Sequence, residues 1–85
     1  MVRDSISYTN EELNALYELG RFYYRMGYYS PAERIFQGIL SINQVETAAH
    51  IGLGLIKLER GAFTDSAEHF REALEYSSFK LQSKL

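Results

Sequence analysis

The sequence predicts an all-α fold made of two helix-turn-helix units, with four helices and short tails. Apolar residues recur at helical spacing along most of the 85 residues. Glycines interrupt this spacing at Gly27 and Gly61, and the whole pattern repeats after about 34 residues. The residue pairs that keep this register are Leu19 and Leu53, Gly20 and Gly54, Gly27 and Gly61, Tyr29 and Phe63, Ala32 and Ser66, Phe36 and Phe70, and Leu40 and Leu74.

Helix-turn-helix units that repeat every ~34 residues are typical of tetratricopeptide repeats. On the residue pairs above, the chain resembles a tetratricopeptide repeat protein over residues 13–76, with one unit at 13–46 and the next at 47–76. The resemblance implies that Gly20 and Gly54 lie where the two helices of a unit cross backbone to backbone. The chain departs from the family pattern at three places. Leu16 and His50 replace an early aromatic residue, and Lys57 replaces the tyrosine that the first unit keeps as Tyr23. Gln44 and Ser78 replace a linker proline.

Composition narrows the class of protein. A chain of 85 residues with 46% hydrophobic content predicts one small domain, near the lower size limit for a stable core. The net charge of −2 argues against a nucleic-acid partner, which needs a basic surface. Without cysteine there are no disulfides, and without a long apolar run we expect neither a signal peptide nor membrane insertion. The expected location is the cytoplasm.

The first unit begins after an N-terminal arm, residues 1–8, that has no helical period. The order Thr9-Asn-Glu-Glu12 predicts a reciprocal capping box at the start of the first helix of a domain spanning 9–76. Gly27 is expected to end that helix. Ser30, Pro31 and Glu33 then predict the start of a second helix, with the serine as cap, and this helix should run to about residue 42.

The second unit follows the same order. Asn43 to Glu46 is expected to cap a third helix that ends at Gly61. Thr64 with Asp65 should open the fourth helix, which ends near residue 76 and is followed by a C-terminal tail or short helix over 77–85. The fourth helix is expected to bury one face, made of Ala67, Phe70, Ala73 and Leu74.

The resemblance places the ligand surface on the first helix of each unit, which lines the concave side in this family. Tyrosines are common anchors at interfaces, and the aliphatic stripe of Ile51, Leu55 and Leu58 suits an apolar contact. An alternative is that residues 79–85 fold back as a fifth helix and cover this stripe. The expected partner-binding residues are Asn14, Tyr17, Arg21, Tyr24 and Arg25 in the first unit, and Ala48, Ile51, Leu55, Leu58 and Glu59 in the second.

Catalytic and metal chemistry find little support in the sequence. His50 and His69 are far apart in repeat position, and His69 with Asp65 is only a pair, whereas zinc needs three or four ligands. Gly52 and Gly54 lie within a helix and follow no strand, so they predict packing contacts and not a dinucleotide site. The cluster of tyrosines at residues 23–29 has one interleaved basic residue, Arg25, and not the series of them that stacking on a nucleic-acid strand requires. We therefore expect no catalytic residue, no metal and no cofactor.

The function expected from this pattern is protein binding. The chain should act as a chaperone or adaptor that holds an amphipathic helix of a partner in its concave groove. In its size, acidity and isolated pair of repeats it is similar to the small cytoplasmic chaperones of bacterial type III secretion, which hold the needle subunit together with a second small co-chaperone. The alternative is a structural module that self-associates, as a homodimer or longer stack, to complete its solenoid.

Overall fold

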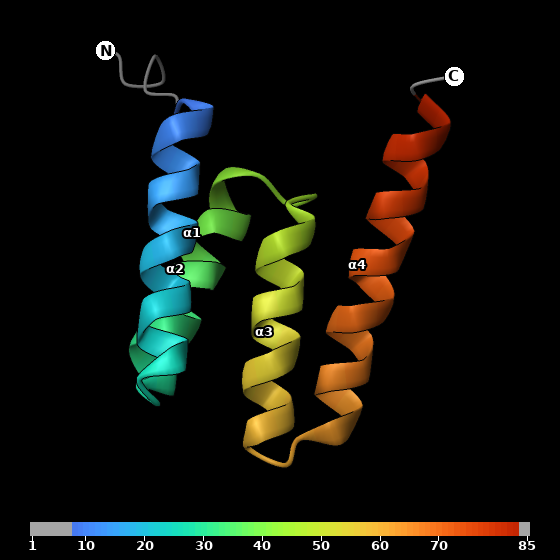
Figure 1. The fold of residues 1–85 in the computed structure, drawn as a ribbon. Helices are drawn as coiled ribbons and strands as arrows, with labels where there is room; N and C mark the ends of the chain where they lie inside the picture. The colour runs from blue at the N-terminus through green and yellow to red at the C-terminus, as the bar shows by residue number, and fades with distance from the viewer. Residues whose placement is uncertain (1–7, 84–85) are drawn as a thin grey trace.

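The chain forms two pairs of antiparallel helices, which confirms the predicted all-α class. The computed structural model describes residues 8–83, with side chains as far as Ser78. Helix α1 pairs with α2 and α3 pairs with α4, while α3 also packs against α2 and so lies in the middle of the molecule (Figure 1). Among the described residues, no helix has the length and apolarity needed to cross a bilayer. The helices are α1 (Asn10–Arg25), α2 (Tyr29–Ile42), α3 (Thr47–Glu59) and α4 (Phe63–Ser83).

Local signals account for the ends of α1. The predicted capping box is confirmed, because the Thr9 hydroxyl accepts from Glu12 N at 3.1 Å and the Glu12 carboxylate accepts from Thr9 N at 2.9 Å. Gly27 follows α1 with φ of 85°, and Gly61 follows α3 with φ of 80°. This left-handed conformation suits glycine and ends both helices in the same way. The predicted N-terminal arm lies, apart from the exposed Tyr8, outside the described residues.

The predicted cap of α2 is wrong. The helix begins at Tyr29, two residues before the expected first residue Pro31, and its N-cap residue Tyr28 makes no side-chain capping bond. Ser30 and Glu33 reach across to α3 instead. The Ser30 hydroxyl accepts from Arg60 at 3.0 Å, and the Glu33 carboxylate accepts from Arg60 at 2.9 Å and from Lys57 at 3.0 Å. These polar side chains therefore join the two units rather than starting a helix.

The predicted cap of α3 is also wrong. The helix begins at Thr47, and its N-cap residue Glu46 makes no side-chain capping bond. The Asn43 side chain accepts from Val45 N at 3.3 Å and so shapes the linker locally. The carbonyl of Gln44 is bonded instead to the ring of His50, one turn into α3, at 3.0 Å.

Helix α4 is longer than predicted and buries a different face. It starts one residue before the expected Thr64 and runs without a break to Ser83, well past the expected end near Tyr76. Residues 79–83 therefore continue α4 and do not fold back over α3, which contradicts the alternative of a covering fifth helix. Ala73 is buried as expected and Phe70 is half-buried, but Ala67 and Leu74 are exposed. Ser66 is buried instead, and its hydroxyl donates to Gly54 O at 2.9 Å.

The core is built around glycines that face aromatic rings. The Phe36 ring of α2 is 1% exposed and lies between Gly20 of α1 and Gly52 of α3. A Cβ atom at either glycine would lie only 2.8 Å or 2.6 Å from the ring. Phe70 of α4 meets Gly54 in the same way, at 2.7 Å. The expected close approach at Gly20 and Gly54 is thus made to a ring of the paired helix, and not to its backbone.

Candidate functional site

A groove between α1 and α3 gathers six of the ten residues expected to bind a partner. It has a volume of about 150 Å³ and its floor is formed by Phe36 and Gly52. We call it the central groove. Gly52 of α3 has no side chain, so the groove extends down to the Phe36 ring, which is buried in the core. The expected residues that line the central groove are Tyr17, Arg21, Tyr24, Arg25, Ile51 and Leu55.

Polar contacts orient the side chains around the central groove. The Tyr24 hydroxyl donates to the Glu59 carboxylate at 3.5 Å, which links the ends of α1 and α3. Burial raises the pKa of Tyr24, and the negative charge of Glu59 raises it further, so the phenol stays protonated and can donate. The Arg21 guanidinium lies 5.8 Å from the centre of the Tyr17 ring. The groove therefore combines an apolar floor with a rim that carries two arginines.

The remaining expected residues lie beside the central groove. Asn14 and Ala48 line a second hollow of about 120 Å³, which is shared with Tyr17. Leu58 lines neither of these two hollows and is exposed. The expected surface is thus one continuous face of α1 and α3, with Leu58 at its margin.

A second apolar surface, not expected from the sequence, lies on α4. It is a hollow of about 290 Å³ beside α3, and Leu74 within it is 69% exposed. Its residues Phe70, Ala73 and Leu74 are equivalent, after a shift of 34, to Phe36, Ile39 and Leu40 of the first unit. Those three residues belong to the face of α2 on which α3 packs. Among residues 8–83 no further helix packs on this hollow, so it is the open counterpart of the α2 surface on which α3 packs. We call it the α4 seat, and it is lined by Thr47, Ile51, Phe70, Ala73, Leu74 and Ser77.

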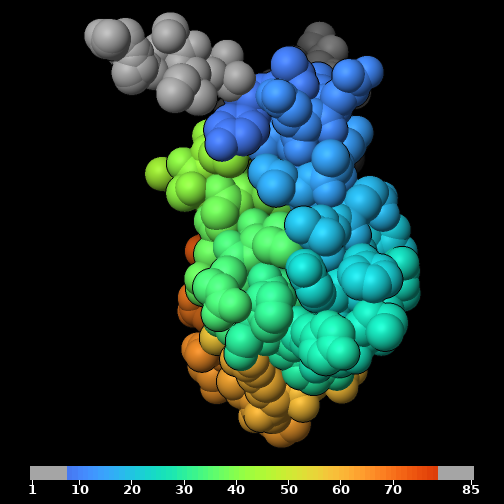
Figure 2. Space-filling view, turned by 90° about the vertical axis from the view of Figure 1, so that its left-hand side faces the viewer, coloured from blue at the N-terminus to red at the C-terminus, as the bar shows by residue number. Residues whose placement is uncertain are grey.

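The opposite end of the molecule carries the matching surface. Leu19, Phe22 and Met26 form an exposed stripe along α1, and Phe22 is 47% exposed. Their equivalents on α3 include Leu53 and Ile56, which are buried against α2. Helices α1 and α2 make up the surface at this end (Figure 2). This α1 stripe is therefore equivalent to the face of α3 that packs against α2. Among the described residues, no helix covers it.

A third site lies on the other side of α3, where the expectation about the histidines is wrong. His50 of α3 and His69 of α4 are not apart, because their ring centres lie 5.9 Å from each other. Glu72, one turn further along α4, approaches both rings: its Oε1 lies 3.3 Å from His50 Nδ1 and 3.9 Å from His69 Nδ1. We call these three residues the histidine cluster. The i, i+3 spacing of His69 and Glu72 was visible in the sequence, but the contribution of His50 was not.

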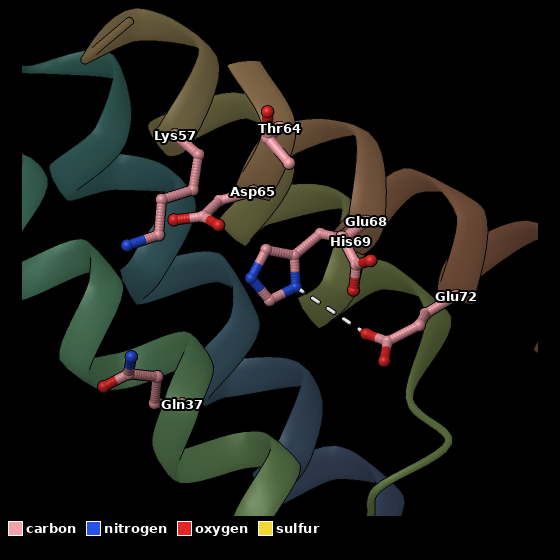
Figure 3. A pocket seen from close by; sticks show the side chains of 7 residues that line it. All are labelled: Gln37, Lys57, Thr64, Asp65, Glu68, His69 and Glu72. Carbon is pink, nitrogen blue, oxygen red and sulfur yellow. Dashed lines mark ion pairs between the residues drawn. The ribbon is translucent and has the colours of Figure 1, made fainter. Parts of the chain in front are cut away.

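His69 and Glu72 of the histidine cluster line a pocket between α2, α3 and α4, whereas His50 is buried behind them. The pocket has a volume of about 470 Å³, and Figure 3 shows the His69 ring pointing into it toward Glu72. Burial lowers the pKa of His69, and the nearby Glu72 carboxylate opposes this shift only in part. His69 is therefore neutral at neutral pH. The other lining residues are Gln37, Lys57, Thr64, Asp65 and Glu68.

Comparison with known proteins adds no family to this description. No protein-family model matches the chain, and no curated protein is significantly similar to it.

Proposed function

We propose that this chain is a protein-binding module and not an enzyme, and that it holds an amphipathic helix of a partner against α1 and α3. The observation that carries the proposal is the central groove, where six residues from two helices converge around one apolar hollow. A hollow of about 150 Å³ suits one large apolar side chain from the partner. Ile51, which lines the groove and is 40% exposed, extends the contact along α3.

The charges on the rim indicate the chemistry of the partner. Arg21 and Arg25 of α1 line the groove and are exposed, and the only acidic contact of Arg21 within the described residues is an exposed pair with Glu18 at 3.4 Å. Exposed pairs of this kind contribute little to stability, so these guanidinium groups are available to a partner. A helix that places an apolar anchor in the groove and acidic side chains beside the arginines would match both features.

The resemblance to tetratricopeptide repeats supports the same proposal. In that family the first helices of the units line the ligand surface, and α1 and α3 are the first helices here. The narrower similarity to type III secretion chaperones makes the proposed client a short helical secreted subunit, held in the cytoplasm before export. A second small co-chaperone would then cover part of the remaining apolar surface.

Leu55→Asp is expected to abolish binding of a helical partner while the chain stays folded. Leu55 is half-buried and lines the central groove, so a carboxylate there would be left without a partner in the contact. The probe is a peptide selected against the wild-type chain from a displayed library of amphipathic helices. Calorimetric titration should show a loss of at least ~30-fold in affinity, the size expected for a central contact. The selected peptides should carry an apolar anchor with acidic neighbours.

Leu58→Asp is the matched control, because this leucine lies on the same helix but outside the central groove. It should change the affinity of the same peptide several-fold at most. Circular dichroism melts of both variants establish that the chain remains helical. Selected peptides that bind Leu55→Asp as tightly as the wild type would contradict a partner site in the central groove.

A second candidate function is self-association, and the two ends of the molecule favour it. The α4 seat is equivalent to the surface of α2 that packs against α3. The α1 stripe is equivalent to the face of α3 that packs against α2. A second copy could therefore place its α1 stripe on the α4 seat and continue the stack. This contact is head to tail, so it would build chains of subunits and not a closed twofold dimer.

Complementary variants test this head-to-tail contact. Leu74→Glu should block the α4 seat and Phe22→Glu should block the α1 stripe, so each variant alone should be monomeric in analytical ultracentrifugation. The wild-type chain should show oligomers that grow with concentration. An equimolar mixture of the two variants should form a heterodimer, because each retains the surface that the other lacks. A wild-type chain that remains monomeric at high concentration would rule out self-association.

A further inference from the structure

We infer that His50, His69 and Glu72 form a binding site for a Zn²⁺ ion that joins α3 to α4. The three side chains come from two helices, and their ligand atoms all lie within 4.8 Å of one another. This inference concerns the side of α3 that faces the α2–α4 pocket, and it is independent of the central groove.

The hydrogen bond of His50 determines which ring nitrogen faces the cluster. Its Nε2 lies 3.0 Å from the backbone carbonyl of Gln44, which can only accept, so Nε2 carries the proton. In the neutral ring Nδ1 then has a free lone pair. Metal-bound histidines commonly donate their second N–H to a backbone carbonyl in this way, which fixes the ring orientation.

The lone pair of His50 is buried without a hydrogen-bond partner. His50 is 6% exposed, and neither His50 Nδ1 nor His69 Nδ1 makes a hydrogen bond to any of the described residues. The nearest polar atom to His50 Nδ1 in the cluster is Glu72 Oε1 at 3.3 Å. A buried imidazole lone pair facing a carboxylate is unfavourable, because both atoms are acceptors. A cation between them removes this conflict.

The distances suit a small transition-metal ion. Ligands at ~2.1 Å around a tetrahedral Zn²⁺ lie about 3.4 Å apart. Glu72 Oε1 lies 3.3 Å from His50 Nδ1 and 3.9 Å from His69 Nδ1, close to this spacing. The longest separation in the cluster is at most 4.8 Å, so it would have to shorten by up to about 1.4 Å on binding. His69 is half-buried on one side of an open pocket, so its side chain has room to make that movement.

The ligand set selects the kind of metal. Two imidazoles and one carboxylate favour Zn²⁺ and similar ions, whereas Mg²⁺ and Ca²⁺ prefer sites made of oxygen ligands. Three protein ligands leave one tetrahedral position that a water molecule can occupy, and two of the ligands, His69 and Glu72, line the pocket of about 470 Å³. Because His50 belongs to α3 and the other two ligands to α4, the ion would link the two helices of the second unit.

Calorimetric titration of the untagged full-length chain with Zn²⁺ tests the site. We expect binding of one ion per chain and a rise in melting temperature, because an ion that binds only the folded state stabilises it. Mg²⁺ should produce neither effect. Co²⁺ should bind in place of Zn²⁺ and show the intense visible absorption of a tetrahedral ion.

His69→Gln and Glu72→Gln should each weaken Zn²⁺ binding at least ten-fold and abolish the rise in melting temperature. These two positions are less buried than His50, so their variants are better tolerated by the fold. Glu68→Gln is the matched control, since Glu68 lines the same pocket but pairs with Arg71 at 3.0 Å and lies outside the cluster. Absence of 1:1 binding, or equal affinity in His69→Gln, Glu72→Gln and Glu68→Gln, would overturn the assignment.

Discussion

Gly52→Leu is expected to unfold most of the chain, whereas Gly38→Leu should leave its stability nearly unchanged. A Cβ atom at Gly52 would lie 2.6 Å from Cε2 and 2.7 Å from Cζ of Phe36, while one at Gly38 would have no neighbour within 4 Å. The Phe36 ring cannot move away, because Gly20 lies against its other edge. Overpacking typically costs about 1–3 kcal/mol, and a side chain as large as leucine in this space should reach or exceed the upper value.

Thermal and urea melts followed by circular dichroism measure this difference. Gly38→Leu is the matched control, because it makes the same change at an exposed position within a helix and replaces glycine with a better helix former. Gly54→Leu should have an intermediate effect, since the Phe70 ring that it meets is only half-buried and borders the open α4 seat. Equal stability of the Gly52 and Gly38 variants would show that the ring is not confined as described.

Phe36→Ala is expected to destabilise the chain by about 3–5 kcal/mol, the usual range for truncating a buried phenylalanine. The Phe36 ring, on α2, is 1% exposed and contacts both α1 and α3. A domain of this size has a total stability of only about 4–13 kcal/mol. The variant should therefore be largely unfolded at room temperature or melt far below the wild type, as measured by circular dichroism.

Phe63→Ala provides the comparison. Phe63 begins α4 and is 67% exposed, so removing its ring should change the free energy of unfolding by no more than about 0.5 kcal/mol. A similar loss of stability in both variants would mean that Phe63 is covered in solution. The α4 end of the molecule would then be in contact with a second copy or a partner.

Local features of the sequence predicted the helices well. The capping box at Thr9 and the turns at Gly27 and Gly61 depend on atoms within a few residues along the chain, and all three were confirmed. The glycine and phenylalanine register predicted which positions pack closely. Helix propensity did not reveal where α4 ends, because its continuation past Tyr76 has no strong stop signal.

The partner of a polar side chain was harder to predict. Glu33 and Ser30 matched a capping pattern, yet Glu33 bonds to Lys57 of α3 and Ser30 bonds to Arg60, the C-cap residue of α3. Either role satisfies the same oxygen atoms, so the sequence alone cannot distinguish them. His50 and His69 were expected apart for a related reason: position within a repeat does not state which faces of two neighbouring helices meet.

The sequence by itself determined the number of helices, their order and the glycine turns between them, because these depend on interactions among residues close together in the chain. Only the tertiary structure decided that Phe36 lies between two glycines, that Glu33 joins the units and that His50 meets His69 and Glu72. Those contacts depend on the crossing angle and axial offset of packed helices. Both are determined by how side chains from different helices fill the core, and neither leaves a local pattern in the sequence.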